Sequence, residues 1–166
     1  MTSDMIEIVP VETKKDRNQF IKFPYTHYSD NVYWVPPLLM DQKILLNTQK
    51  HPFYEHAYVQ FFLAKQDDQV VGRIAAIIDI RHNETHQEQT GFFGFFETID
   101  NYHVAEKLLD AVRIWTKNNE MNCLRGPVNP CLNEDAGTLI DSFDSSPCIM
   151  MPYNPPYYAE FLERYG

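Results

Sequence analysis

Two histidines and two glutamates alternate in a polar segment, as His82, Glu84, His86 and Glu88. On an extended strand, alternating side chains share one face, and two imidazoles with two carboxylates can bind a divalent metal. Polar segments of this composition are also common solvated loops, and no further residues that would complete a metal cage stand out. The sequence therefore favours a polar loop over residues 81–90, and we expect no metal.

A second candidate for chemistry is the thiol of Cys131, which lies close to Glu134 and Asp135 in the sequence. A nucleophilic cysteine needs a nearby base or cation to form the thiolate. His103 could supply that base only where the fold brings the two residues together. The neighbouring carboxylates raise the thiol pKa, so the pattern favours a free cysteine without a catalytic role.

Charged residues near the C-terminal end suggest two further binding sites. An acidic stretch consists of Glu134, Asp135, Asp141 and Asp144. It could recognise or deprotonate an amine, but capping and loop hydrogen bonds are the favoured explanation. Arg125 is a lone cation in an apolar segment, and a buried guanidinium needs a carboxylate partner. That partner is either a structural Asp or Glu, which we favour, or a substrate carboxylate held bidentately.

The elements that must position these residues follow from the hydrophobic pattern. Short apolar runs predict strands over 6–11, 58–64, 70–80 and 91–99, the last three as an antiparallel meander. A stripe with three- and four-residue spacing predicts a long helix over 101–119, capped by Asp100 or Asn101. Shorter helices are expected over 14–21, ending before Pro24, over 38–46 and over 157–164. A strand over 124–128, following a crossover helix, should lie parallel to 91–99. Residues 129–146 should be loop, with a short helix within them as the alternative, and 148–151 a further strand. This order predicts an α+β fold with a mixed sheet.

Length and charge narrow the class of protein. The chain has 166 residues, which suggests one domain, and its net charge is −9. Nucleic acid and anionic membranes are therefore not expected partners, because both need clustered cations. The sequence shows no signal peptide and no apolar run that could span a membrane, and its three cysteines lack metal-finger spacing. These features predict a reduced, cytoplasmic protein.

The order of elements is similar to that of the GNAT (Gcn5-related N-acetyltransferase) superfamily. The likeness is strongest to a group of uncharacterised bacterial GNAT-like proteins about twice this length. The segments that carry the resemblance are residues 91–97 (GFFGFFE), 125–130 (RGPVNP) and 150–158 (MPYNPPYY with the preceding Met150). It implies a GNAT-like fold with a mostly antiparallel sheet flanked by helices. It also implies a single domain over 1–166 that is incomplete at its C-terminus, with a homodimer or a missing C-terminal segment completing the sheet.

The resemblance implies that acetyl-CoA or another acyl-CoA is the cofactor. In the superfamily, N–H groups at the start of the long helix hold the CoA diphosphate. The matching residues here are Ile99, His103, Val104 and Ala105. The usual pattern of Gln or Arg, two residues, Gly, one residue, then Gly or Ala fits only at Ala105. Asp100 and Glu97 add negative charge, and two like charges ~4 Å apart repel by about 1 kcal/mol in water. This departure counts against ordinary CoA binding.

The resemblance also implies roles near the last helix. A tyrosine there often protonates the leaving thiolate, but Leu162 occupies that position. Tyr158 and Tyr157, about one turn earlier, are therefore the candidate catalytic residues. Tyr153 and Asn154, together with Arg125, are candidate substrate residues, since this region faces the acyl acceptor in the superfamily. Packing with satisfied polar groups is the alternative for the tyrosines and the asparagine.

Two functions from different classes follow. The first is an acyl-CoA-dependent N-acyltransferase acting on a small-molecule amine. The alternative is a non-catalytic GNAT-like domain with a degenerate CoA site, which serves as the structural or partner-binding half of a larger protein. The state of the N–H groups between Glu97 and Ala105 separates them. Free groups would suit a diphosphate, whereas groups paired with the chain's own acceptors would not.

Overall fold

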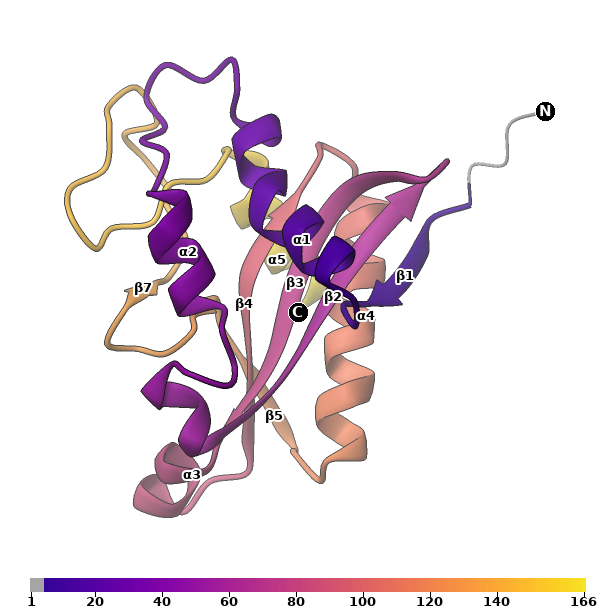
Figure 1. The fold of residues 1–166 in the computed structure, drawn as a ribbon, viewed down its shortest axis with the longest axis vertical. Coiled ribbons are helices and arrows are strands. Elements are labelled where there is room, and N and C mark those ends of the chain that lie inside the picture. The colour runs from indigo at the N-terminus through magenta and orange to yellow at the C-terminus, as the bar shows by residue number, and fades with distance from the viewer. Residues whose placement is uncertain (1–4) are drawn as a thin grey trace.

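A computed structural model describes residues 5–166, and its centre is a five-stranded sheet with the order β1-β2-β3-β4-β5 (Figure 1). The strands are β1 (Glu7–Pro10), β2 (Ala57–Gln66), β3 (Gln69–Asp79), β4 (Thr90–Thr98) and β5 (Cys123–Arg125). Neighbours among the first four pair antiparallel, and β5 pairs parallel to β4. The predicted meander, the parallel strand and the α+β class are confirmed.

Helices cover both faces of this sheet. Their bounds are α1 (Lys14–His27), α2 (Leu39–Leu45), the 3-10 helix η1 (Pro52–Glu55), α3 (Ile80–His86), α4 (Tyr102–Asn118) and α5 (Tyr157–Tyr165). A separate two-stranded sheet joins β6 (Val128–Asn129) to β7 (Asp135–Ala136). Helix α1 crosses one face, and α4 lies behind the other (Figure 1). None of the described helices is long and apolar enough to cross a membrane.

The aromatic strand β4 supplies both halves of the core. Phe93 and Phe96 belong to the apolar cluster under α4, whereas Phe92 and Phe95 belong to the cluster under α1. The register between β3 and β4 shifts at this point. Arg73 of β3 lies opposite Glu97, whereas Ala75, two residues later, lies opposite Gly94. Phe95 takes a positive φ of 50° at this bulge. Bulges redirect side chains and bend the strand, and this one lies beside the candidate site.

Helix α1 continues through Pro24 to His27, so the expected end before that proline is wrong. Proline lacks an N–H group, which leaves the carbonyl four residues earlier without its helical donor. That carbonyl belongs to Phe20, and it accepts a 2.9 Å hydrogen bond from Arg73 Nη1 of β3. A tertiary contact therefore replaces the missing helical bond, and no local pattern could have revealed it.

Two other expectations fail in detail. Residues 80–86 form helix α3 rather than a polar loop, because the Asp79 side chain caps the helix by accepting from His82 N at 3.1 Å. The alternating His and Glu residues therefore do not share one face of a strand. Residues 148–151 form a turn closed by a 3.1 Å bond from Met151 N to Cys148 O, and not a strand.

Candidate functional site

The start of α4, the predicted diphosphate site, is closed by the chain's own acceptors. The Asn101 side chain accepts from His103 N at 3.0 Å and serves as the N-cap. The Asn101 carbonyl accepts from Val104 N at 3.0 Å and from Ala105 N at 3.4 Å, while Ile99 N donates to Val71 O at 3.0 Å. All four residues predicted to bind CoA therefore have their N–H groups paired.

The exposed edge of β4 is closed as well. Strand β5 pairs with β4 only over Thr90–Phe92, and no strand within residues 5–166 forms a hydrogen-bonded ladder with the rest of this edge. Phe95 N donates to the Asn129 side chain at 2.6 Å, and Thr98 N donates to Tyr158 OH at 2.7 Å. The backbone of residue 128 lies where a Cβ on Gly94 would be. Both side chains come from segments that follow β5.

These contacts decide whether an acyl-CoA fits. A CoA laid along this edge needs donors for its diphosphate and amide groups. The N–H groups of His103, Val104 and Ala105 at the start of α4, and two N–H groups of β4, already bond to protein. The carboxylates of Glu97 and Asp100 lie nearby in the chain. The residues present do not fit an acyl-CoA held here.

A buried polar cluster surrounds Glu97 on the α1 face of the sheet. Glu97 Oε2 accepts from Tyr28 OH at 2.6 Å and from Tyr158 OH at 2.8 Å. Glu97 Oε1 lies 3.8 Å from Arg73 Nη2. His27 Nε2 is 3.4 Å from the Tyr158 hydroxyl. Sequence analysis had noted Glu97 only as an unfavourable charge near the diphosphate.

Burial sets the protonation of this cluster. It raises the pKa of Glu97, an effect that Arg73 and the two tyrosine donors oppose. Burial and then Arg73 lower the pKa of His27 to about 4. Burial raises the pKa of Tyr158 well above its ordinary value. At neutral pH the imidazole is uncharged and Tyr158 keeps its proton, so the cluster offers a shielded carboxyl group of enhanced basicity.

Arg73 is the buried cation that sequence analysis missed. The residue is 5% exposed, its guanidinium carbon lies 4.9 Å from the centre of the Phe20 ring, and burial lowers its pKa. The argument that a cation in an apolar strand needs a partner was applied to Arg125. It describes Arg73 better, since Arg73 lies within the apolar run 70–80. Arg125 is exposed at the sheet edge and pairs with Glu88 at 3.4 Å.

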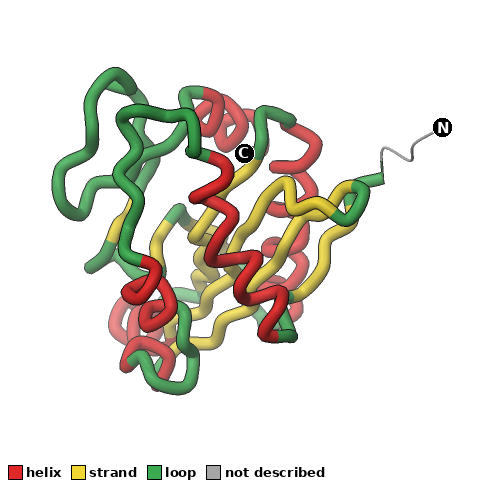
Figure 2. The backbone as a smooth tube through the Cα atoms, turned by 45° about the horizontal axis from the view of Figure 1, so that its top comes forward, coloured by secondary structure: helices red, strands yellow, loops and turns green. Residues whose placement is uncertain are grey.

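A cavity of about 300 Å³ opens beside the cluster. It lies between α1, the segment after α1, α2 and the loops on either side of β7, and Figure 2 shows these loops gathered on one side of the sheet. Polar or charged groups reach it from Arg73, Glu97, Asn129, Glu134, Asp135 and Tyr153. A second cavity of about 50 Å³ shares Arg73 and Glu97 and also touches Tyr158.

The predicted C-terminal residues gather around these cavities. Tyr157 OH donates to Thr98 O at 2.9 Å. Tyr153 OH accepts from the Asn31 side chain at 2.8 Å and lines both cavities. Asn154 is buried. Its side-chain oxygen accepts a hydrogen bond from Leu139 N at 2.7 Å, and its side-chain nitrogen donates one to Leu139 O at 3.2 Å. The roles assigned to these residues stay predictions, and their hydroxyl and amide groups have structural partners.

The cysteine and the histidine that the sequence offered as a catalytic pair lie in different parts of the molecule. Cys131 lines a cavity of about 290 Å³ with His82 and His86, on the α1 side of the sheet. His103 instead lies at the start of α4 and contacts Glu106 at 3.2 Å. Within residues 5–166, no three His, Cys, Asp or Glu side chains come together in a group that could hold a metal.

The chain is similar in sequence to two named bacterial proteins. No family model matches the chain. It is 38% identical to Protein YghO of Escherichia coli (strain K12) over 92% of its own length and 39% of that protein. It is 31% identical to Bacterial ceramide synthase of Caulobacter vibrioides (strain NA1000 / CB15N), over 99% of the chain and 43% of that protein. The chain thus spans about two fifths of the length of these relatives.

A solved structure supports the fold directly. A tandem GNAT protein from the clavulanic acid biosynthesis pathway, determined without AcCoA, matches 98% of this chain with a TM-score of 0.62 at 12% identity. The match covers 43% of that tandem protein. At this identity the likeness concerns the fold rather than the chemistry. The chain has the GNAT fold, as its sequence predicted.

Proposed function

We propose that the chain acts as one GNAT-like half of a longer acyl-CoA-dependent N-acyltransferase, and that this half does not itself hold the CoA. A ceramide contains an amide formed on an amino group, and the chain is 31% identical to a protein named bacterial ceramide synthase. The tandem GNAT match supports an arrangement of two such halves. Acetyl-CoA or another acyl-CoA then binds outside the described residues. A cytoplasmic location stays a prediction.

The paired state of the donors on β4 and α4 carries this proposal. A diphosphate finds no free N–H group at His103, Val104 or Ala105 unless it displaces their hydrogen bonds to Asn101. Each displaced bond has a net value of about 1 kcal/mol, and a buried group left unpaired costs about 1–3 kcal/mol. Repulsion from nearby carboxylates adds to this cost.

The contribution of this half is the acceptor side of the reaction. Glu97 lines both cavities, and its raised pKa brings it closer to that of a base working near neutral pH. We assign it the task of accepting a proton from the acceptor's ammonium group. Tyr158 and Tyr28 hold its Oε2 in place, while Tyr157 anchors the same end of β4 through Thr98.

The alternative function is that of a non-catalytic half of a larger protein, which has a structural role or binds a partner. Exposed apolar side chains favour it, since they gather on the segment before α2, on α2 itself and on the loop around residues 132–151. They are Val32, Val35, Leu38, Leu39, Met40, Ile44, Leu132, Ile140, Ile149, Met150 and Met151. Patches of this kind often mark interfaces. Under this alternative, the remainder of a longer protein or a second copy of the chain covers them.

An acyl-transfer assay tests the proposal. The native gene product and the 166-residue chain are each incubated with acetyl-CoA or a long-chain acyl-CoA and a panel of primary amines, and amide products are measured by mass spectrometry. We expect products from the native gene product, a rate reduced roughly hundredfold in Glu97→Gln, and no loss in the exposed control Glu163→Gln. An unaffected Glu97→Gln enzyme would reject the role of Glu97. Absence of any product from the native gene product would favour the structural alternative.

A further inference from the structure

Exposed apolar side chains gather in two segments of the chain. Twelve of the fifteen large apolar side chains that are exposed among residues 5–166 lie in residues 30–44 and 132–151, which together we call the α2 face. The other three are Met5, Tyr58 and Ile114. Proteins that work alone rarely expose many such side chains together, so the α2 face has the composition of an interface.

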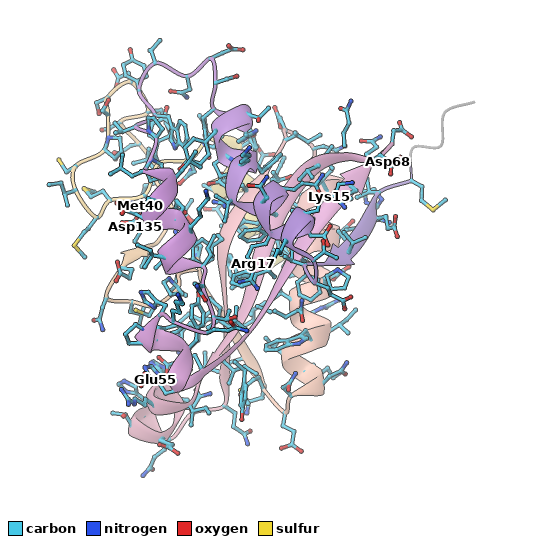
Figure 3. The ribbon with its side chains drawn as sticks, in the orientation of Figure 1. Lys15, Arg17, Met40, Glu55, Asp68 and Asp135 are labelled. Carbon is cyan, nitrogen blue, oxygen red and sulfur yellow. The ribbon has the colours of Figure 1, made fainter. Side chains whose placement is uncertain are left out.

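The two segments of the α2 face lie against each other. Both contribute residues to the lining of the larger cavity. Ile44 of α2 and Glu134 of the loop also line a further cavity of about 330 Å³. Met40 on α2 and Asp135 of β7 lie on the same side of the molecule, far from Asp68 at the β2–β3 turn (Figure 3). The exposed apolar side chains therefore belong to one surface.

The α2 face is also acidic. Its two segments hold six carboxylates, and Lys43 is their single Lys or Arg, so these 35 residues contribute −5 to the net charge of −9. None of the six carboxylates forms an ion pair within residues 5–166. They belong to Asp30, Asp41, Glu134, Asp135, Asp141 and Asp144. Unpaired charges of one sign favour a partner surface of the opposite sign.

This combination of apolar and acidic groups narrows the possible occupant. A symmetric dimer would place the α2 face against its own copy, so that two sets of unpaired carboxylates would meet. An anionic membrane would be repelled for the same reason. A polypeptide surface whose apolar side chains are bordered by Lys and Arg complements both kinds of group.

We propose that the rest of a longer protein docks on the α2 face through apolar side chains bordered by Lys and Arg. The chain spans about two fifths of the length of its relatives, so a second part of the same protein is the nearest source of such a surface. This inference rests on the proposed function in taking the chain to be one half of a longer protein. It adds the face that the halves share and the chemistry that joins them. It differs from completion of the sheet, which would cover the edge at β5.

Two cysteines report which side of the molecule is covered. Cys148 lies in the α2 face and Cys123 lies on β5, and both are exposed. The native gene product and the 166-residue chain are alkylated with iodoacetamide, and the rate at each cysteine is followed by mass spectrometry of peptides. We expect Cys148 to react roughly tenfold or more slowly in the native gene product, because burial limits access to a thiol, and Cys123 to react equally in both. Equal rates at Cys148, or protection at Cys123 alone, would overturn the proposal.

Peptide binding tests the chemistry of the contact. Isothermal titration calorimetry compares a designed helical peptide, with Leu along one face and Lys along the other, with the same peptide carrying Glu in place of Lys. We expect the Lys peptide to bind the 166-residue chain roughly tenfold or more tightly, and the preference to fall as salt is raised. Equal affinity for the two peptides, or no binding of the Lys peptide, would overturn the proposal. Binding to phosphatidylcholine vesicles instead, or self-association of the chain seen by light scattering, would assign the face to a lipid surface or a second copy and reject it as well.

Variants of exposed residues locate the binding without disturbing the core. Ile149→Ser should weaken the Lys peptide roughly tenfold, whereas Ile114→Ser on α4 is the matched control and should not. The double variant Asp141→Asn with Asp144→Asn should remove most of the preference for Lys over Glu. Its matched control is Asp68→Asn at the β2–β3 turn. If the variants on the α2 face bind like their controls, this face is not the docking surface.

The two proposals fail separately. Acyl transfer by a native gene product in which Cys148 stays fully reactive would reject the docking face alone. Protection of Cys148 without any acyl transfer would reject the proposed chemistry alone, and the α2 face would then serve the structural alternative.

Discussion

The two sides of β4 differ in how completely their polar groups are paired. At its open edge and at the start of α4, the donors meet acceptors from Asn129, Tyr158 and Asn101. On the α1 face, Arg73 keeps unused donors beside a cavity. A buried donor without a partner is costly, so each such exception needs an explanation. The difference leaves the α1 face, beside the larger cavity, as the side of β4 on which the proposed function places the acceptor.

The largest expected effect concerns the packing that closes the edge. Gly94→Ala would place a Cβ against the backbone of residue 128, so strand β4 or the segment after β5 must move. We expect a loss of about 3 kcal/mol in the free energy of unfolding, measured by urea denaturation. Gly137→Ala is the control, because its Cβ meets no atom within 4 Å. Its positive φ of 92° strains an alanine, and we expect this to cost about 1–2 kcal/mol. A smaller loss at Gly94 than at Gly137 would contradict tight closure.

The next largest effect concerns Tyr158, whose hydroxyl bonds both the edge of β4 and the Glu97 cluster. Tyr158→Phe removes the acceptor of Thr98 N and one donor to Glu97, and it leaves both groups buried. We expect about 2 kcal/mol of destabilisation. Tyr165→Phe, whose hydroxyl bonds the half-exposed Asp110, should cost under about 1 kcal/mol. If the two variants lose equal stability, the Glu97 cluster has no special value.

A smaller effect concerns the cap of α4. Asn101→Ala removes the acceptor of His103 N, and we expect a loss of about 1 kcal/mol in unfolding free energy. Asn101→Asp should be neutral or stabilising by about 0.3–1 kcal/mol, because a carboxylate favours a helix N-terminus. Thermal unfolding of both variants measures this. Destabilisation by Asn101→Asp would show that the helix start does not behave as a simple capped end.

The smallest net effect is the pH dependence of the cluster. Burial lowers the pKa of His27 from 6.5 to about 4, so between these values the unfolded chain binds more protons and stability rises with pH. Glu97 acts in the opposite sense. Its pKa is raised in the folded state, so stability falls as pH increases from about 4.5 through the folded pKa. The two slopes partly cancel in the wild type.

Single variants should separate these slopes. Urea denaturation between pH 4 and 8 should show a weaker rise of stability in His27→Gln and a steeper rise in Glu97→Gln. Asp16 supplies a background term, since its pKa is lowered mainly by hydrogen bonds from Thr13, and this term is common to all the variants compared. Parallel pH profiles for the wild type and both variants would show that neither group is perturbed as described.

The sequence predicted elements that depend on local pattern. The apolar stripe of α4 and the hairpin of β2 and β3 needed only periodicity and a polar turn. Helix α3 was not predicted, because its polar composition favoured a loop and the capping role of Asp79 was not considered. Pro24 was mistaken for a helix end because its compensating bond comes from Arg73, 49 positions away in the sequence.

The candidate site was less accessible to sequence reasoning. Tyr153 and Tyr158 line the cavities, and only the family resemblance had singled them out. Their catalytic and substrate roles stay predictions. Glu97 receives hydrogen bonds from residues 69 and 61 positions away, which no spacing rule reveals. Arg73 could have been found, because a cation inside an apolar run is as visible in the sequence as Arg125. Its unused donors, however, appear only once the fold is known.

The most direct test of the account is a calorimetric titration of the purified 166-residue chain with acetyl-CoA and with a long-chain acyl-CoA, paired with its melting temperature. The account predicts no saturable heat and no shift of the melting temperature up to millimolar ligand. Ligand at 100 times its dissociation constant would stabilise the fold by about 2.7 kcal/mol. Saturable binding with a shift of several degrees would therefore contradict the closed edge and show that this half holds the cofactor itself.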